Sequence, residues 1–566
     1  MENIFFDLTV IICLAALFSI IFRLLKQPAI LAYILTGIII APFHFFDASN
    51  QPLLLALSQV GITLLLFMVG LEIRITELMS MGKMLLLSSA WQISLSFILG
   101  FLISATLGFD RLSSFYIATA ITFSSTIIVV KLLSDQHELH SLHGKFSLGI
   151  LLSQDVVAIV FLMFLTAAAR ESPFLGPVGN FVSVLIKGVL IIAAIAFLSK
   201  NIFPKLFERI ARSSETLFLA SLGWVFGLAA FVSSKFIGFS IEIGGFLAGV
   251  ALANSLVNYQ IIAKAKILRD FFIVIFFVLL GIQMSFANIA EIFVPAIILS
   301  LFVLIAKPFI VMVILGLLGY KKRTSFLTGV SLSQISEFSL ILAFLGLSLG
   351  HIDQKTVSLI TMVGLITFAV STYMITHWKT LYRKFEKTLS FLEKKDSQNE
   401  KTLDESSLES LDDHVVVIGG DQMGASVIEA LEDQKVDIVL VDFDPTIVKK
   451  YEKKEVGQRV FWLFGDISDL DIQQRAKLDN ARMVISTIPD IEDNLLLLKE
   501  LRHENRRAKI VMMAIEGKEA RTLYREGADY VVLPHLAGGR QIAKLIEENA
   551  LSKLEKLKDK DKKYLK

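Results

Sequence analysis

Long apolar runs separated by short charged segments occupy the first two thirds of the chain. Runs of about 17–25 mostly apolar residues are long enough to cross a bilayer as a helix. Thirteen such spans are predicted, at residues 4–22, 28–43, 54–72, 84–107, 113–132, 146–168, 180–199, 214–234, 239–257, 271–287, 292–318, 324–348 and 356–378. Charged residues become dense after residue 379. The pattern therefore predicts a membrane domain over residues 1–379, followed by a cytosolic part.

The loops between these spans carry basic residues mainly on alternate sides. If the N-terminus lies outside, the inside loops hold clusters such as Arg23 with Lys26 and residues 321–323, whereas the outside loops hold single residues such as Arg111 and Lys235. Because cytoplasmic loops are enriched in Lys and Arg, we expect the N-terminus outside. Thirteen spans then bring the charged tail to the cytoplasm.

Composition supports a membrane protein and narrows its chemistry. The chain has 566 residues, of which 54% are hydrophobic, and its mean hydropathy is +0.66, which is far above that of a soluble globular protein. The single Cys13 excludes an internal disulfide framework and a cysteine metal site. The net charge of +2 gives no indication of a nucleic-acid partner.

Two predicted spans are interrupted by polar residues at equivalent positions. If spans 1–6 and 8–13 form an inverted repeat, the fifth and twelfth spans correspond to each other. The fifth span carries Ser124, Ser125 and Thr126, and the twelfth carries a polar stretch that ends at Glu337. Broken helices at matching positions indicate a transport site. The alternative is that these hydroxyl groups pack helices together.

One acid stands alone in the sixth span. Asp155 is the only acidic residue between residues 146 and 168, and it follows Ser153 and Gln154. Charged side chains are costly inside a membrane, and they usually mark ion pathways. The hydroxyl, amide and carboxylate oxygens of these three residues suggest a small cation site. The alternative is an acid that a buried neighbour neutralises and that serves only packing.

Two further ionisable residues fall near the middle of spans. Lys307 precedes Pro308, which frees a backbone carbonyl and can bend the helix, and Glu337 lies in the twelfth span. Lys307 can pair with Asp155 and compete with a cation for the carboxylate. The alternatives are a structural role for Lys307 and an acid that bonds the exposed amides of a broken helix for Glu337. Glu242 lies near an interface, where we expect it to be solvated or to cap a helix.

The tail reads as a linker followed by an α/β domain. Residues 380–412 are charged and lack apolar periodicity, which predicts a linker or an exposed helix. A Rossmann-like domain is predicted over residues 413–536 and a charged helix over 537–566. Its strands are expected at residues 414–418, 437–441, 460–464, 483–487, 509–514 and 530–533.

A glycine-containing turn follows the first of these strands. Residues 419–424 read GGDQMG, and the second strand ends at Asp442, which is close to the dinucleotide-binding pattern. Asp421 replaces the middle glycine and would repel a diphosphate, which argues against NAD(H). We therefore predict AMP or another adenine nucleotide at Gly419, Gly424, Asp442 and Asp466, with no obligatory cofactor. The alternative is a domain that dimerises without a ligand.

Several stretches together identify the chain as similar to a transporter family. They are residues 61–72 (GITLLLFMVGLE), 124–126 (SST), 154–155 (QD), 244–254 (GGFLAGVALAN), 276–281 (FFVLLG), Lys307 and 333–338 (SQISEF). They resemble the monovalent cation:proton antiporter-2 family, in particular the Kef-type potassium/proton exchangers. The tail is similar to the nucleotide-binding half of regulators of potassium conductance, which Kef-type proteins carry at this position.

The resemblance implies a polytopic α-helical membrane domain with two crossed, broken helices, in a homodimer of the bacterial inner membrane. It implies an ion site at Asp155 and Gln154. Electrogenic relatives often carry a second aspartate at the Gln154 position, so the Gln-Asp pair implies exchange of one K⁺ or Na⁺ for one proton. The predicted ion-site residues are Asp155, Gln154, Ser125, Thr126, Lys307 and Glu337.

One segment departs from the family pattern. Glutathione-gated Kef-type proteins carry an acid-rich segment after the Ala-Asn stretch, whereas the predicted loop 258–270 is basic here. We therefore expect neither glutathione gating nor an accessory oxidoreductase. The predicted function is K⁺ or Na⁺/H⁺ antiport, and the alternative is a ligand-gated K⁺ efflux channel. A membrane oxidoreductase is disfavoured because the sequence shows no catalytic set, so the chain is not expected to be an enzyme.

Overall fold

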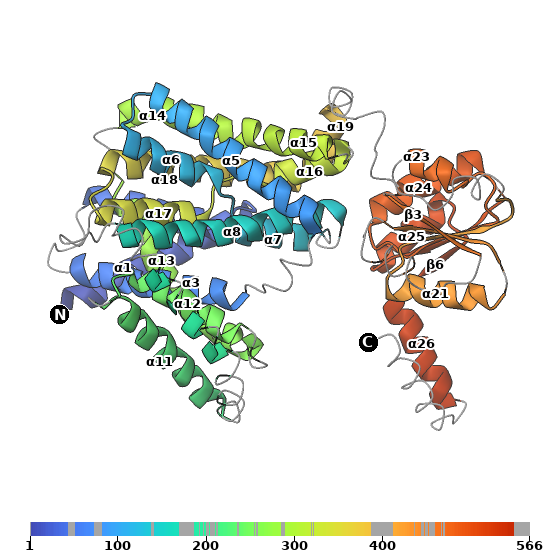
Figure 1. Ribbon diagram of the computed structural model, residues 1–566, viewed down its shortest axis with the longest axis horizontal. Coiled ribbons are helices and arrows are strands. Elements are labelled where there is room, and N and C mark those ends of the chain that lie inside the picture. Colours follow the sequence, from blue (N-terminus) through green and yellow to red (C-terminus); the bar gives the residue numbers. More distant parts are fainter. Residues whose placement is uncertain are drawn as a thin grey trace. The chain divides into compact units, whose positions relative to one another are not determined.

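The structure is a computed structural model in which the chain forms two compact units, Met1–Lys394 and Lys395–Lys566 (Figure 1). The structure describes residues 2–43, 51–72, 82–136, 138, 141–168, scattered positions from 186 to 210, 213–234, 237–253, 255, 258–284, 289–318, 320, 322–385, 411–434, 436–442, 447, 451, 459–465, 467, 470–505 and 507–547. Part of the predicted seventh span, residues 386–410 of the linker, Asp466 and residues 548–566 lie outside this description.

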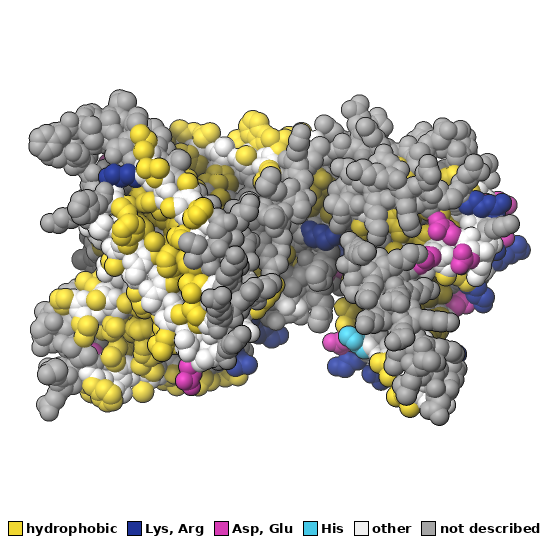
Figure 2. Space-filling model, turned by 60° about the horizontal axis from the view of Figure 1, so that its bottom comes forward, with side chains coloured by type: hydrophobic (Ala, Val, Ile, Leu, Met, Phe, Trp, Pro, Cys, Tyr) yellow, Lys and Arg dark blue, Asp and Glu magenta, His cyan; other side chains and the backbone are white. Residues whose placement is uncertain are grey.

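The first unit is a bundle of apolar helices. Its helices are α1 (Glu2–Leu24), α2 (Ala29–Ile40), α3 (Gln51–Glu72), α5 (Gly82–Thr106), α6 (Arg111–Thr122), α7 (Thr126–Asp135), α8 (Leu142–Ala168), α11 (Ser214–Val232), α12 (Ile241–Leu252), α13 (Asn258–Ile282), α14 (Ile289–Leu301), α15 (Lys307–Leu317), α16 (Lys322–Ser331), α17 (Glu337–Ser348), α18 (Gln354–Thr376) and α19 (Trp378–Phe385). Among the described residues, eight helical segments are long and apolar enough to cross a membrane. Hydrophobic side chains cover much of the described surface of this unit in Figure 2, as expected for helices that face lipid.

Both predicted helix breaks are confirmed. Residues 123–125 separate α6 from α7, and residues 332–336 separate α16 from α17. Side-chain oxygens cap the new helix starts: Ser125 accepts a hydrogen bond from the Ile128 amide, and Ser336 accepts one from the Phe338 amide. Hydroxyl residues at a break satisfy amides that have no partner inside the helix, which lets the chain interrupt a helix in an apolar surrounding.

Glycines allow two helix pairs to pack in backbone contact. A Cβ atom on Gly249 of α12 would lie 2.1 Å from the Phe67 carbonyl oxygen of α3, and one on Gly70 would lie 2.3 Å from that of Phe246. A Cβ atom on Gly281 of α13 would similarly lie 2.2 Å from the Ile34 carbonyl oxygen of α2. Small residues permit this approach in membrane helices. The pairs α3–α12 and α2–α13 therefore depend on these glycines.

Helix α13 corrects one expectation from the sequence. Residues 258–270 were expected to form a loop, but α13 begins at Asn258 and continues to Ile282. Apolar windows detect the stretch that faces lipid, and they miss a charged helical extension beyond it. Because Lys, Arg, Ala and Leu favour helix, the basic segment extends α13.

The predicted span 292–318 contains a change of helix type. Helix α14 passes into a π-helical turn at Phe302–Ala306, labelled η4, and α15 follows from Lys307. Pro308 has no amide hydrogen, so it cannot continue the regular α-helical bonding at this point. The π turn ends directly before Lys307, the residue that precedes Pro308.

The second unit is a doubly wound α/β domain. Its strands are β1 (Val415–Ile418), β2 (Ile438–Asp442), β3 (Val460–Phe464), β4 (Met483–Ser486), β5 (Lys509–Met513) and β6 (Tyr530–Val532). All pair in parallel in the order β3-β2-β1-β4-β5-β6, the arrangement of a Rossmann fold. The described helices of this unit are α21 (Gln422–Glu432), α23 (Leu470–Arg475), α24 (Ile491–Glu504), α25 (Gly517–Glu526) and α26 (Pro534–Glu547).

The strands follow the sequence prediction to within one residue at each end. Buried apolar runs such as VVVI in β1 and IVLVD in β2 identify them, because both faces of a parallel sheet are covered. The strand order places the glycine-containing turn after β1 and Asp442 at the end of the neighbouring β2.

Candidate ion-binding site

The two breaks meet beside α8 in the interior of the membrane unit. The Ser124 hydroxyl donates to the Leu332 carbonyl oxygen at 3.1 Å, which joins one break to the other. The Ser339 hydroxyl of α17 donates to the Ala120 carbonyl oxygen of α6 at 2.5 Å. These bonds link elements that are more than 200 residues apart in the sequence, and we call their meeting point the crossing.

Asp155 faces the start of α7 at this crossing. Its Oδ2 atom accepts a hydrogen bond from the Thr126 hydroxyl at 2.8 Å. The residue is only 5% exposed, and its Oδ1 atom accepts no hydrogen bond from a residue that the structure describes. Thr126 is the first residue of α7, so the carboxylate also lies at the positive end of a helix dipole. One carboxylate oxygen of Asp155 is thus left for a further partner.

Gln154 holds the first break in place. Its Oε1 atom accepts a hydrogen bond from the Ser124 amide at 2.8 Å, and its Nε2 atom donates one to the Gln92 Oε1 atom at 2.6 Å. The Gln92 Nε2 atom in turn donates to the Ser96 hydroxyl at 3.1 Å. The Gln154 amide oxygen is therefore engaged with the protein backbone, whereas the sequence suggested it as an ion ligand.

Ser153, Gln154 and Asp155 do not converge on one point. Successive residues of an α-helix project about 100° apart, so three neighbours on α8 cannot face a common ion. The Ser153 hydroxyl donates back to the Gly149 carbonyl oxygen of its own helix at 2.8 Å. The linear order of oxygens along the sequence therefore does not describe the site, and the hydrogen-bonding partner of Asp155 comes from α7.

Lys307 binds the carbonyl ends of the broken helices. Its Nζ atom donates to the carbonyl oxygens of Ile121 at 3.1 Å, Phe123 at 3.0 Å and Gln334 at 3.0 Å. The side chain is fully buried. These three bonds use every hydrogen of the ammonium group. In the part of the chain that the structure describes, no ion pair joins Lys307 to Asp155, so the pairing considered from the sequence is not found.

Glu337 lies at the amide ends of the same helices. It is the first residue of α17, and its Oε1 atom accepts a hydrogen bond from the Ser125 hydroxyl at 2.6 Å. Ser125 is also the N-cap of α7. An acid is favourable near helix N-termini and a cation near helix C-termini. Glu337 and Lys307 therefore complement the dipoles of the half-helices that meet at the crossing.

Gln92 and Gln334 complete the crossing but were not among the ion-site residues predicted from the sequence. The Gln334 Nε2 atom donates to the Ser125 carbonyl oxygen at 3.4 Å. The backbone carbonyl oxygen of Gln334 accepts a hydrogen bond from the Lys307 Nζ atom. Gln92 is a buried amide within the apolar run of α5. A lone amide in an apolar span was the available signal, because it needs a buried hydrogen-bonding partner.

The glycine-containing turn of the second unit is closed by an acid of the same unit, Asp442. Gly419 adopts φ +89°, and a Cβ atom on Gly424 would lie 1.8 Å from the Gly419 carbonyl oxygen, so both glycines are required by the backbone. The Asp442 Oδ2 atom accepts a hydrogen bond from the Gly420 amide at 2.7 Å. Asp421 is exposed and makes no capping hydrogen bond at the start of α21.

Comparison with known families supplies the context for this geometry. The family described as sodium/hydrogen exchanger, transmembrane, matches residues 10–379, and the TrkA-N domain matches residues 415–534. Together, these two matches cover the crossing and the parallel sheet. The second match agrees with the Rossmann-like fold seen in the structure, which is a nucleotide-binding fold.

Individual proteins are similar over most of the chain. The putative cation/proton antiporter YbaL of Escherichia coli is 26% identical over 551 residues, which cover 94% of this chain and 95% of that protein. The putative K⁺ efflux antiporter KefB of Alkalimonas amylolytica is 24% identical over 525 residues, or 92% and 78% of the two chains. The sodium proton antiporter MjNhaP1 of Methanocaldococcus jannaschii aligns with a TM-score of 0.49 and 17% identity, covering 69% of this chain and 98% of that one.

Proposed function

Because the chain belongs to the sodium/hydrogen exchanger family, we propose that its membrane unit exchanges K⁺ or Na⁺ for protons at Asp155. Membership in this family makes the chain a transporter rather than an enzyme, and it favours antiport over a channel. The observation that carries the choice of residue is the Oδ1 atom of the buried Asp155, which accepts no hydrogen bond from any residue that the structure describes. Lys307 and Glu337 are instead engaged in holding the crossing together.

The exchange follows from the chemistry of one carboxylate. A proton on Asp155 neutralises the negative charge that attracts a cation. A bound cation likewise neutralises the charge that attracts a proton. The two ligands therefore compete for the same oxygen atoms, and each leaves when the other binds. The Thr126 hydroxyl oxygen adjoins the carboxylate and can supply a further ligand. If the site faces the two sides of the membrane in turn, competition becomes counter-transport.

A one-for-one stoichiometry is part of the proposal. Gln154 carries no charge, and its amide is bonded to Ser124 and Gln92. Asp155 then exchanges one cation for one proton without net movement of charge. Reversal measurements in proteoliposomes test this: net proton flux should stop when the cation gradient equals the proton gradient, whatever membrane potential is imposed. A reversal point that shifts with the potential would exclude one-for-one exchange.

The sharpest test of the site is the Asp155→Asn substitution. An amide cannot ionise, so we expect cation-dependent proton movement in proteoliposomes to fall below about 1% of the unmodified rate, on the premise that Asp155 is the exchanged charge. Asp7→Asn is the matched control, because Asp7 is also a buried acid in a membrane helix and lies on α1, away from the crossing. Full exchange by the Asp155→Asn protein would rule out this site.

We further propose that the cytosolic unit regulates exchange by binding an adenine nucleotide such as AMP. The turn at Gly419 and Gly424 is built as in nucleotide-binding folds, and the exposed Asp421 would repel a diphosphate. Calorimetric titration of the full chain with AMP, ATP and NADH tests this, and AMP is expected to give the largest heat. Absence of heat with all three would favour a domain that works without a nucleotide.

The remaining features of the proposal come from the sequence pattern and the family resemblance. They are an N-terminus outside the bacterial inner membrane, a cytoplasmic tail, a homodimer and no gating by glutathione. Residues 258–270 are basic and helical, in contrast to the acid-rich segment of glutathione-gated relatives. Exchange that is insensitive to added glutathione would agree with this expectation, whereas activation by glutathione would contradict it.

A further inference from the structure

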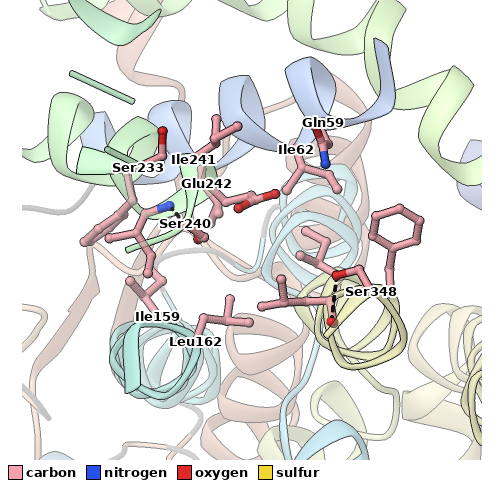
Figure 3. Close-up of a pocket in the computed structure, with 15 residues that line it drawn as sticks. Gln59, Ile62, Ile159, Leu162, Ser233, Ser240, Ile241, Glu242 and Ser348 are labelled. Carbon is pink, nitrogen blue, oxygen red and sulfur yellow. Dashed lines mark hydrogen bonds between the residues drawn. The ribbon is translucent and has the colours of Figure 1, made fainter. Parts of the chain in front are cut away.

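A cavity of about 270 Å³ lies among α3, α8, α12 and α17. Most of its lining is apolar, with Gln59 and three serine hydroxyls as neutral polar groups. Glu242 is the only ionisable residue among the described residues that line it. In Figure 3 the Glu242 carboxylate projects into the space between Ile62 of α3 and Leu162 of α8.

The cavity lies one helical turn from the ion site on two separate helices. On α8, Asp155 is followed four residues later by Ile159, which lines the cavity. On α17, Glu337 is followed four residues later by Ile341, which also lines it. Residues four apart share a helix face, and four residues rise about 6 Å along the axis. The cavity therefore adjoins the crossing along both helices.

The polar groups of the cavity suit a cation. Ser348 donates its hydroxyl hydrogen to the Leu345 carbonyl at 2.8 Å, which leaves its oxygen lone pairs available. Glu242 is half-buried and makes no hydrogen bond or ion pair with any residue that the structure describes. Carboxylate, hydroxyl and amide oxygens are ligands for hard cations, and the volume can hold a cation together with several water molecules.

We infer that Glu242 forms a second cation site in this cavity, where a partly hydrated K⁺ or Na⁺ binds before it reaches Asp155. This inference rests on the proposed exchange at Asp155 for its purpose, though the binding itself does not require transport. The carboxylate raises the local cation concentration beside the crossing, since an acid in an apolar cleft focuses its field there. Glu242 thus governs how readily cations reach the site rather than the exchange at Asp155.

The alternative role for Glu242 is to stabilise the start of α12, and the chain offers a matched control for that role. Glu242 is the second residue of α12 after the N-cap Ser240, where an acid stabilises the helix dipole. Glu215 is the second residue of α11 after the N-cap Ser213, but it is exposed and does not line the cavity. Glu242→Gln and Glu215→Gln therefore make the same change at equivalent helix positions.

Charged thiol reagents can measure the field in the cavity directly. A Ser348→Cys protein, in a background where the only native cysteine is removed by Cys13→Ser, is placed in lipid nanodiscs that leave both faces open. Its labelling rates with a cationic and an anionic methanethiosulfonate are compared by mass spectrometry. We expect the preference for the cationic reagent to fall about tenfold with Glu242→Gln and to stay unchanged with Glu215→Gln and Glu242→Asp. K⁺ or Na⁺ should slow cationic labelling only while the carboxylate is present.

The outcomes separate this inference from the proposed function. An unchanged reagent preference after Glu242→Gln, or equal changes from the two glutamine substitutions, would overturn the cation site. Loss of exchange by Asp155→Asn with no change in labelling preference on Glu242→Gln would leave the proposed function standing and remove the inference. A clear labelling effect in a protein that does not exchange ions would support the cation site at Glu242 and overturn the proposed function.

Discussion

Two carboxylates, Asp155 in the membrane unit and Asp442 in the Rossmann-like unit, both lie against a break in regular structure. Asp442 accepts a hydrogen bond from the Gly420 amide at 2.7 Å and so closes a backbone turn. Asp155 accepts only the Thr126 hydroxyl at 2.8 Å and keeps its Oδ1 atom unbonded among the described residues. A hydroxyl can rotate, whereas a turn amide is fixed in place. The comparison separates an acid that holds the fold from one that can exchange its partner.

The same distinction applies within the crossing. Lys307 and Glu337 are ionisable and buried, which by itself would make them transport candidates. Their partners are three backbone carbonyls and the N-cap serine of α7. These contacts neutralise helix ends, so neither group is free to release its charge while the crossing stays intact. Charge at the crossing is therefore divided between a structural pair and one carboxylate.

The largest effect on stability should come from Lys307→Met, which removes the structural contacts of Lys307 at the crossing. The substitution keeps a long side chain but leaves three buried carbonyls without a donor, and each lost partner costs about 1 kcal/mol or more. We expect destabilisation of about 3 kcal/mol, seen as a lower midpoint of thermal unfolding in detergent. Lys187→Met is the control, because Lys187 makes a single long bond to the Ile237 carbonyl at 3.4 Å. Unchanged stability of the Lys307→Met protein would mean that Lys307 is not structural.

A smaller effect is expected from Asp442→Ala in the Rossmann-like unit. The Gly420 amide loses a charged acceptor, which costs about 2 kcal/mol, and the turn after β1 should exchange its amide hydrogens faster. Hydrogen-exchange mass spectrometry of peptides covering residues 415–424 measures this. Asp421→Ala serves as the control, because Asp421 is exposed and caps nothing. Equal exchange in both variants would show that Asp442 does not hold the turn.

Gln154→Ala tests whether the neutral neighbour of Asp155 acts through position alone. Loss of its bond to the Ser124 amide should slow exchange about tenfold, because about 1.4 kcal/mol of positioning is removed, while the cation and proton continue to compete. Gln92→Ala should act in the same direction, since it supports Gln154. Ser153→Ala should have little effect. A Gln154→Ala protein that exchanges ions at the full rate would remove Gln154 from the site.

The smallest effect is expected at Asp529, an acid near the surface of the Rossmann-like unit. Although burial raises the pKa of the Asp529 carboxyl, hydrogen bonds from the Ile510 amide and from Arg502 and Lys509 outweigh it and hold the pKa below its usual value. A depressed pKa gives stability above the unfolded-state pKa that is lost as the pH falls through the folded-state pKa. Asp529→Asn should therefore lower unfolding midpoints slightly at pH 7, with a smaller difference in strong acid. An equal difference at both pH values would contradict this account.

The breaks and strands were predictable because their signals are local. Polar clusters such as Ser124–Thr126 interrupt apolar runs, and β1 and β2 are short continuous runs of buried residues. The partners of Lys307 were not predictable, since the Ile121 and Phe123 carbonyls lie 186 and 184 residues away. The role inferred for Glu242 likewise depends on a cavity that several helices form together. Sequence pattern identified the ionisable residues, and only their three-dimensional partners separate their roles.

The π turn before Lys307 has a consequence for how this helix tolerates change. A π turn holds one more residue than the α-helical turn it replaces, so deleting one residue from Phe302–Ala306 would restore regular winding. Because the extra residue is accommodated inside the turn, the residues after it would keep their direction relative to α14, and Lys307 would still face the carbonyls that it binds. A one-residue deletion in the regular part of α14 would instead rotate Lys307 by about 100° relative to the residues before the deletion. Chain length is therefore constrained less tightly within these five residues than in the regular helix before them.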